Sequence, residues 1–279
     1  MRELPEIETI RRALDKEAGG KKVKTAEVLA PMSALPRHPN KKHFGQKLEG
    51  AKLDSIERRG LTILITLDTG DVWVVDLGHG GTIVKSTPKE PVTKETLLVI
   101  AFTQGGQVRV VDASGTATMS VIAADDLGTE MPELDNLGLD PVETPISWTL
   151  FAEMLRGRKA KLKAFLVDQT TITGLGDLYA DEILFAAGLR PDRVAGSLTT
   201  QEIRRLYRSI VETLHDGIKY RGTSLDGDGY VDLYGKPGDY QEHVKVYQRE
   251  KDACRRCRVP IVKMRSGGTT TYLCEQCQV

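Results

Sequence analysis

The chain has 279 residues, and 40% of them are hydrophobic, which is enough for two compact domains or one large one. No run of 18 apolar residues occurs and the second residue is charged, so we expect neither a membrane span nor a secretory signal, and a cytoplasmic location. The formal net charge is zero and aromatic content is 5%, which argues against a strongly basic nucleic-acid binder and against a platform that stacks single-stranded bases.

The charge is unevenly divided. From residue 151 onward the chain has 21 of its 39 basic residues and 17 of its 39 acidic residues. The part before residue 151 therefore has 18 basic and 22 acidic residues. The second half of the chain is therefore slightly basic and the first slightly acidic, which weakly favours phosphate contacts in the second half.

The first half is predicted to be a short helix followed by strands. Pro5 among acidic neighbours suits the start of a helix, and Ile7, Ile10 and Leu14 follow at helical spacing. From about residue 22 to 122, short apolar and alternating runs separated by glycine-containing turns indicate a β-sandwich or barrel. Residues 124–147 are rich in Asp, Glu, Pro and Gly, as expected of a linker.

The second half begins as a helical region. Apolar residues three and four apart predict helices over 148–167, 178–187 and 200–220, and a stretch rich in Gly, Asp and Tyr predicts a loop over 222–240. The expected organisation is therefore an amino-terminal domain at 1–123, a linker at 124–147, a helical domain at 148–240 and a cysteine-bearing segment at 241–279.

All four cysteines lie in that last segment. Cys254-x2-Cys257 and Cys274-x2-Cys277 are separated by 16 residues, which is the spacing of a four-thiolate zinc site on a hairpin. Four protein ligands leave no open position, so we expect one structural zinc ion. The alternative is a pair of disulfides or redox thiols, which the absence of a secretion signal disfavours.

Three segments together resemble the formamidopyrimidine-DNA glycosylase and endonuclease VIII family. They are ELPEIET at residues 3–9, GLGDLYADEIL at 174–184, and the cysteine finger that VYQR at 246–249 introduces. The resemblance implies an α+β fold: an amino-terminal helix and β-sandwich, then a helix–two-turn–helix domain with a zinc-finger β-hairpin. Its partner would be double-stranded DNA, with or without damage, bound by a monomer that contacts no membrane.

The family's chemistry is base excision. The target base is turned out of the duplex, and the amine of an amino-terminal proline attacks the sugar carbon to form a Schiff base; loss of the base and strand scission follow. By this resemblance, Glu3 matches the glutamate that moves protons and Glu6 the second glutamate of the motif. Arg2 stands where the proline is expected, and Leu61 where the family has a catalytic lysine.

Other family positions also differ. His79 replaces the residue that fills the gap left by the flipped base, and residues 113–116 (ASGT) replace the loop that wedges the helix open. Asp177 replaces an asparagine that binds phosphate in the family. Thr269 replaces the arginine of the zinc finger, and Arg265 is a candidate to take over the role of that arginine. Lys159, Lys161 and Tyr179 remain as candidate nucleic-acid contacts, with Arg158 and Lys163 in the same basic run.

Simpler interpretations stand beside these. Glu3 and Glu6 are residues that commonly start a helix, and Asp177 is a common helix N-cap. His79 can be a surface residue, and the basic run can be the solvated face of a helix. Leu61 can simply pack in the core. Our leading hypothesis is a DNA-binding family member with glycosylase and lyase activity lost or reduced. One alternative is an active enzyme that uses the Met1 amine, about 3.8 Å further along the chain, with Glu3. Another is a cleft reassigned to RNA or to a protein partner.

Overall fold

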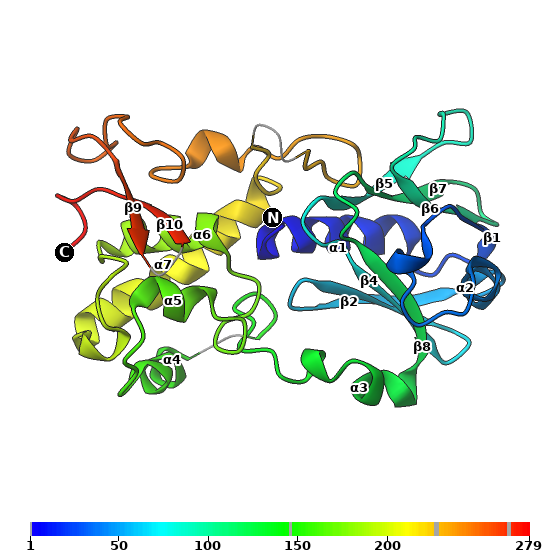
Figure 1. Cartoon of the computed structure of the whole chain (residues 1–279), viewed down its shortest axis with the longest axis horizontal. Coiled ribbons are helices and arrows are strands. Elements are labelled where there is room, and N and C mark those ends of the chain that lie inside the picture. Colours follow the sequence, from blue (N-terminus) through cyan, green and yellow to red (C-terminus); the bar gives the residue numbers. More distant parts are fainter. Residues whose placement is uncertain (1, 145–146, 226–228, 267–268) are drawn as a thin grey trace. The chain divides into compact units, whose positions relative to one another are not determined.

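The structure is a computed structural model that describes residues 2–144, 147–225, 229–266 and 269–279. The chain divides into two compact units. Unit 1 comprises residues 1–135 and 220–239, and unit 2 comprises residues 136–219 and 240–279. Figure 1 shows that unit 1 contains the strands β1 to β8, and that unit 2 contains α4 to α7 and the hairpin of β9 and β10.

Unit 1 is a β-sandwich of two four-stranded antiparallel sheets; the alternating apolar pattern left a sandwich or a barrel open, and the resemblance implied the sandwich. One sheet has the order β1-β6-β7-β5, formed by Val23–Val28, Thr96–Phe102, Gln107–Asp112 and Gly81–Ser86. The other has the order β2-β3-β4-β8, formed by Leu53–Arg59, Thr62–Leu67, Asp71–Asp76 and Thr118–Ala123. Alternate residues such as Ile65, Trp73 and Ile100 point inward and form one buried core.

Helix α1, Leu4–Ala18, packs its apolar stripe against this core through Ile7, Ile10 and Leu14. Pro5 lies in its first turn, where a missing N–H leaves no hydrogen bond unmade. Two short helices were not predicted. Helix α2, Lys41–Leu48, interrupts the strand region, and α3, Leu127–Glu130, lies in the expected linker.

Residues 220–239 pack on unit 1, whereas the sequence pattern places them in the helical domain. Their apolar side chains Tyr230 and Leu233 belong to the sandwich core, and the Thr223 N–H donates to Glu6 Oε1 at 2.8 Å. A loop rich in Gly and Asp has no periodic pattern that would reveal such a partner.

Unit 2 contains α4 (Trp148–Leu155), α5 (Leu162–Val167), α6 (Asp177–Ala187) and α7 (Thr200–Lys219). The helix predicted over 148–167 is two helices, because the backbone leaves the helical conformation at Arg156, with a ψ of 123°, and turns at Gly157, with a φ of 71°. Among the described residues, no helix combines the length and apolarity needed to cross a membrane.

The carboxyl-terminal segment forms the β-hairpin of β9 (Val262–Ser266) and β10 (Thr269–Leu273). A small apolar cluster of Phe185, Val246, Cys254, Ile261 and Cys274 joins it to α6. Arg256 also lies over the Phe185 ring, with 4.3 Å between the guanidinium carbon and the ring centroid. The architecture of sandwich, helical domain and finger that the resemblance implies is thus confirmed.

Candidate functional site

Arg2 is buried at the amino end of α1. Its Nε donates to the Gly81 carbonyl oxygen at 3.1 Å and its Nη2 to that of Gly80 at 3.2 Å. The guanidinium also lies 5.0 Å from the centroid of the Tyr230 ring, and the residue is 1% exposed. These contacts hold the Arg2 side chain inside unit 1, between β5 and the 220–239 segment.

Glu3 and Glu6 shape the start of α1. The Glu3 backbone N–H donates to Glu6 Oε2 at 3.0 Å, and the other Glu6 oxygen accepts from Thr223. Both residues are at least 95% buried. The Glu6 carboxylate therefore caps the helix and anchors the 220–239 segment, which is the structural role that the sequence left open as an alternative.

Leu61 lies in the turn between β2 and β3 and packs against the core, as the simpler interpretation predicts. The same turn is fixed by Arg58, whose Nη1 donates to the Gly60 carbonyl oxygen at 2.7 Å and whose Nε contacts Glu8 Oε2 at 3.1 Å. No ammonium group is available at position 61 for phosphate contact or proton transfer.

His79 is exposed in the tight turn before β5, and its N–H donates to Thr116 Oγ1 at 2.9 Å. The opposing turn is held by Asp112. One oxygen of Asp112 accepts from the Ser114 N–H at 2.7 Å, and the other accepts from the Ala117 N–H at 2.7 Å. Residues 113–116 thus form a compact turn with no large side chain.

The basic run of unit 2 is not one solvated helix face, so that interpretation is wrong. Arg158 and Lys159 lie exposed between α4 and α5, and Lys161 precedes α5 as its exposed N-cap residue. Lys163 instead points inward, with its side chain 6% exposed. Lys159 and Lys161 remain candidate phosphate contacts.

Lys163 connects α5, α6 and the finger. Its Nζ lies 3.0 Å from Asp177 Oδ1, 2.9 Å from Asp181 Oδ1 and 2.6 Å from the Thr270 carbonyl oxygen. Burial raises the pKa of Asp181 to about 7, against the opposing effect of Lys163. Asp177 is the first residue of α6 and Gly176 is the N-cap, so the N-cap interpretation is wrong; the Asp177 carboxylate is partly neutralised by Lys163.

Tyr179 and Glu182 are buried in unit 2. Tyr179 is 0% exposed and its ring packs 5.2 Å from that of Tyr240, so in this structure it is a packing residue and not the surface contact we expected. The Glu182 carboxylate accepts hydrogen bonds from the N–H groups of residues 245, 246 and 247 at 2.8–2.9 Å. It fixes the segment that leads into the finger.

Arg265 lies exposed on β9, across the hairpin from Thr270. Thr269, the position where the family has an arginine, begins β10 and is also exposed. Arg265 therefore remains available on the finger as a candidate phosphate contact.

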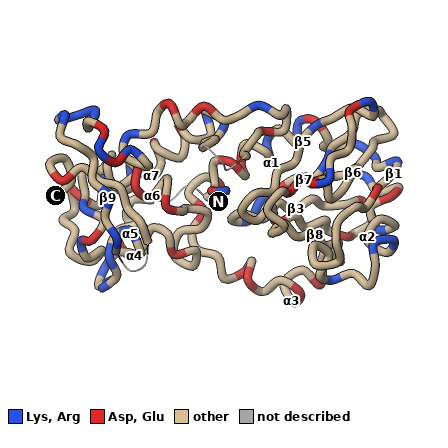
Figure 2. The backbone as a smooth tube through the Cα atoms, turned by 45° about the horizontal axis from the view of Figure 1, so that its top comes forward, with Lys and Arg blue, Asp and Glu red and all other residues tan. Residues whose placement is uncertain are grey.

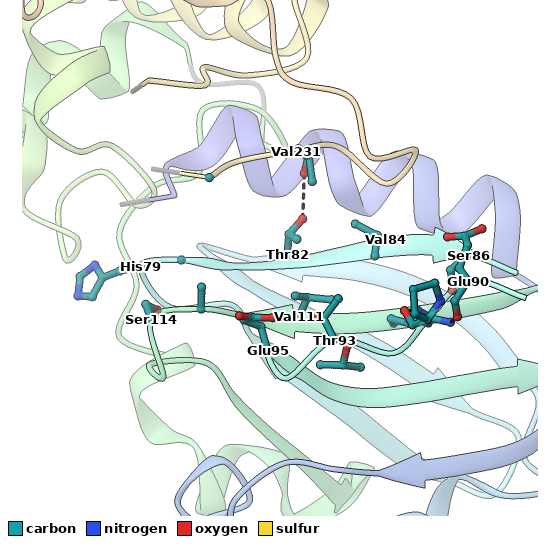
Figure 3. Close-up of a pocket in the computed structure, with 16 residues that line it drawn as sticks. His79, Thr82, Val84, Ser86, Glu90, Thr93, Glu95, Val111, Ser114 and Val231 are labelled. Atoms are coloured by element: carbon teal, nitrogen blue, oxygen red, sulfur yellow. Dashed lines mark hydrogen bonds between the residues drawn. The ribbon is translucent and has the colours of Figure 1, made fainter. Parts of the chain in front are cut away.

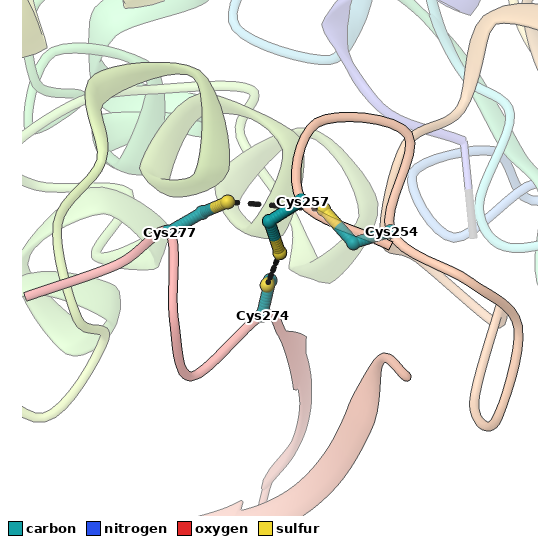
Figure 4. A group of neighbouring side chains, drawn as sticks. All are labelled: Cys254, Cys257, Cys274 and Cys277. Atoms are coloured by element: carbon teal, nitrogen blue, oxygen red, sulfur yellow. Dashed lines mark hydrogen bonds between the residues drawn. The ribbon is translucent and has the colours of Figure 1, made fainter. Parts of the chain in front are cut away.

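The four cysteines meet at the base of this hairpin (Figure 4). Their Sγ atoms all lie within 4.8 Å of one another, with 3.8 Å between Cys254 and Cys277 and 3.4 Å between Cys257 and Cys274. A tetrahedron with Zn–S bonds of about 2.3 Å requires sulfurs about 3.8 Å apart. The thiols are free, so the disulfide alternative is wrong, and the donor set fits one structural zinc ion.

Several supporting residues were not identified from the sequence. Arg58, Asp181 and Glu182 are charged residues that the structure buries against specific partners. The only available signal was their position: Asp181 and Glu182 lie on the apolar face of a helix, where an unpaired charge is costly. Their partners lie tens of residues away, so spacing alone gives no indication of them.

Comparison with known proteins yields three family models that together span most of the chain. The formamidopyrimidine-DNA glycosylase N-terminal domain matches residues 1–119 and the formamidopyrimidine-DNA glycosylase H2TH domain matches residues 137–227. The zinc finger found in FPG and IleRS matches residues 251–279.

Individual relatives agree over the whole length. The chain is 36% identical to a formamidopyrimidine-DNA glycosylase of Pelotomaculum thermopropionicum, covering all of this chain and 99% of that protein. It is 34% identical to that of Geobacillus kaustophilus, covering both completely. A solved complex between the Lactococcus lactis Fpg and DNA containing an abasic site matches with a TM-score of 0.87 and 29% identity, over 99% of each chain.

Proposed function

Since this chain belongs to the formamidopyrimidine-DNA glycosylase family, we propose that it binds double-stranded DNA while its glycosylase and lyase activities are lost or strongly reduced. The observation that carries this proposal is the burial of Arg2. The family's nucleophile is the amine of a terminal proline, and here residue 2 is an arginine whose side chain is bonded to Gly80 and Gly81.

The surroundings of Arg2 support the same conclusion. Leu61 supplies no ammonium group, and the Glu6 carboxylate holds two backbone N–H groups. A long charged second residue also normally prevents removal of the initiator methionine, which would place the free amine one residue away from the expected position. A near-attack geometry tolerates much less than the roughly 3.8 Å between neighbouring Cα atoms.

DNA binding is supported by what the solved relatives contain and by the exposed cations of unit 2. The Lactococcus lactis protein has been solved with DNA that contains an abasic site and with DNA that contains Fapy-dG. Lys159, Lys161 and Arg265 are exposed on unit 2 of this chain. Figure 2 shows basic and acidic positions interspersed along both units, so phosphate contact would depend on a few placed cations.

Borohydride trapping on a duplex with an abasic site tests the loss of chemistry. We expect no covalent adduct from the wild-type protein under conditions in which the Geobacillus kaustophilus relative gives one, because Arg2 stands where the family has its nucleophilic proline. Intact-mass analysis of the same sample should show that Met1 is retained. An adduct on Met1 would overturn the proposal in favour of an active enzyme; Met1 itself lies outside the described residues.

The double variant Arg2→Pro/Leu61→Lys provides the positive test. We expect it to form an adduct that neither single variant forms, because the amine and the lysine serve different steps of the same reaction. A matched control is Arg2→Pro/Leu61→Met, which restores the amine alone. If the control reacts as fast as the lysine-bearing variant, Leu61 is not responsible for the loss.

A further inference from the structure

An open groove of about 950 Å³ lies on the outer face of the sheet that contains β5 and β7 (Figure 3). Thr82, Val84 and Ser86 line it from β5, and Arg109 and Val111 line it from β7. Thr82 pairs with Val111 and Val84 with Arg109 across the two strands, so these side chains share one face while Ile83, Val108 and Val110 face the core. We call this site the β5–β7 groove.

Both walls of the β5–β7 groove are held by hydrogen bonds. On one side, the Thr82 hydroxyl donates to the Val231 carbonyl oxygen at 2.9 Å, and the Lys85 N–H donates to that of Leu233 at 2.6 Å. On the other side, Arg109 donates to the carbonyl oxygens of Pro91 at 2.7 Å and Glu90 at 2.8 Å. The groove is therefore a preformed site.

Negatively charged groups outnumber positively charged ones among the ionised side chains that line the groove. They are the carboxylates of Glu90 and Glu95 and the guanidinium of Arg109, and the guanidinium is directed at backbone carbonyls. Hydrogen bonds from its own backbone N–H and the Thr93 hydroxyl lower the pKa of Glu95, so it is ionised at neutral pH. Lys94 Nζ lies 3.8 Å from Glu95, but its side chain is 92% exposed and easily displaced.

Ser86 supplies a hydroxyl to the groove. The residue is 5% exposed and lines the groove, and its hydroxyl makes no hydrogen bond to the residues that the structure describes. A ligand in the groove can therefore use this hydroxyl as a hydrogen-bond donor or acceptor. The groove thus offers a carboxylate, a free hydroxyl and a valine floor.

We propose that the β5–β7 groove is a docking site for an arginine side chain of a partner protein. The guanidinium lies against the Glu95 carboxylate, and the aliphatic stem lies on Val84 and Val111. A planar guanidinium matches a carboxylate with two parallel hydrogen bonds, and its hydrocarbon stem gains by covering apolar surface. Gly80, whose carbonyl oxygen accepts from Arg2 Nη2, and His79 and Ser114 line one end of the groove, in addition to the Glu95 carboxylate proposed to bind the guanidinium.

Charge complementarity favours a protein over a nucleic acid at this groove. Unit 1 contains 20 Lys and Arg against 24 Asp and Glu, so a phosphate backbone is repelled there while a basic protein segment is attracted. The volume exceeds that of one side chain, so neighbouring residues of an extended segment fit beside the arginine.

NMR titration of the full chain with N-acetyl-arginine methylamide tests this assignment. We expect backbone amide shifts at Thr82, Val84 and Val111, and a Kd at least about fivefold weaker for Glu95→Gln, which removes the charge and keeps the shape. Glu133→Gln removes an exposed carboxylate of unit 1 that does not line the groove, so its Kd should equal that of wild type. Zinc content and thermal unfolding check that each variant is folded.

Three results would overturn the assignment. One is an unchanged Kd for Glu95→Gln. Another is equal or tighter binding of N-acetyl-lysine methylamide or spermidine, which would indicate unspecific attraction of cations. The third is tighter binding of guanosine, whose N–H edge resembles a guanidinium and which would make the groove a nucleobase site. Selective, Glu95-dependent binding of the arginine probe supports the proposal.

Discussion

Glu8 is the carboxylate on which three guanidinium groups of unit 1 converge. Its oxygens lie 2.9 Å from Arg11 Nη2, 2.6 Å from Arg12 Nε and 3.1 Å from Arg58 Nε. Burial opposes ionisation of Glu8, but the three arginines outweigh it and lower its pKa from 4.5 to about 2. Ionised Glu8 therefore stabilises the attachment of α1 to the β2–β3 turn.

We expect Glu8→Gln to lower the free energy of unfolding by on the order of 3 kcal/mol at pH 7. Because the folded pKa lies below the unfolded one, this contribution is complete above pH 4.5 and is lost as the pH falls toward 2. Urea denaturation of both proteins between pH 3 and 7 measures it. Glu57→Gln, at an exposed site beside Arg58, is the control and should change stability by less than about 1 kcal/mol.

Single residues differ in how far sequence alone predicts their roles. The pattern of Pro5 with acidic neighbours correctly predicts the start of α1, because helix termini follow local rules. The second role of Glu6, which is to hold Thr223, depends on a residue 217 positions away and has no local signal. The same holds for Arg2, whose partners are the carbonyls of Gly80 and Gly81.

At the scale of elements, Lys163 joins α5, α6 and β10. Asp181 Oδ1 forms an ion pair with its ammonium at 2.9 Å, and Asp181 Oδ2 accepts a hydrogen bond from the Tyr272 N–H at 2.8 Å. We expect Lys163→Met to destabilise unit 2 by about 3–5 kcal/mol, because Asp181 then remains buried without its cation. Amide exchange at Tyr272 should speed up accordingly.

The double variant Lys163→Met/Asp181→Leu should recover most of that loss, because it removes both charges together. Lys159→Met is the control, since Lys159 is exposed, and it should leave the exchange rate at Tyr272 unchanged. A double variant as unstable as Lys163→Met alone would show that packing, and not the unpaired charge, causes the loss.

The periodicity of apolar residues predicts where helices and strands lie better than it predicts where they are interrupted. The alternating apolar runs correctly predict a β-sheet domain, although they leave a sandwich and a barrel open, and the cysteine spacing correctly predicts the zinc finger. The single helix expected over 148–167 fails at Gly157, because the apolar pattern continues across the break. The β5–β7 groove is unpredictable from sequence, since it requires knowing which face of β5 turns away from the core.

For the whole molecule, salt dependence distinguishes DNA binding from its alternatives. We expect binding to duplex DNA to weaken steeply with salt, and the variant Lys159→Ala/Lys161→Ala to lower the slope of log K against log salt by about 2. Lys24→Ala, an exposed lysine of unit 1, is the matched control and should leave the slope unchanged. A flat dependence for the wild-type protein would indicate a protein partner, and preference for an RNA duplex would indicate RNA.

The placement of residues 220–239 in unit 1 has a consequence for dissecting the molecule. The polypeptide passes between the units at 135–136, again at 219–220, and back at 239–240. A single cut at one of these three junctions leaves the units covalently joined at the other two. Expression of residues 1–135 alone would omit the 220–239 segment, which contacts Glu6 through Thr223 and Arg2 through Tyr230. A self-sufficient amino-terminal fragment would need residues 220–239 grafted back onto it through a designed connection.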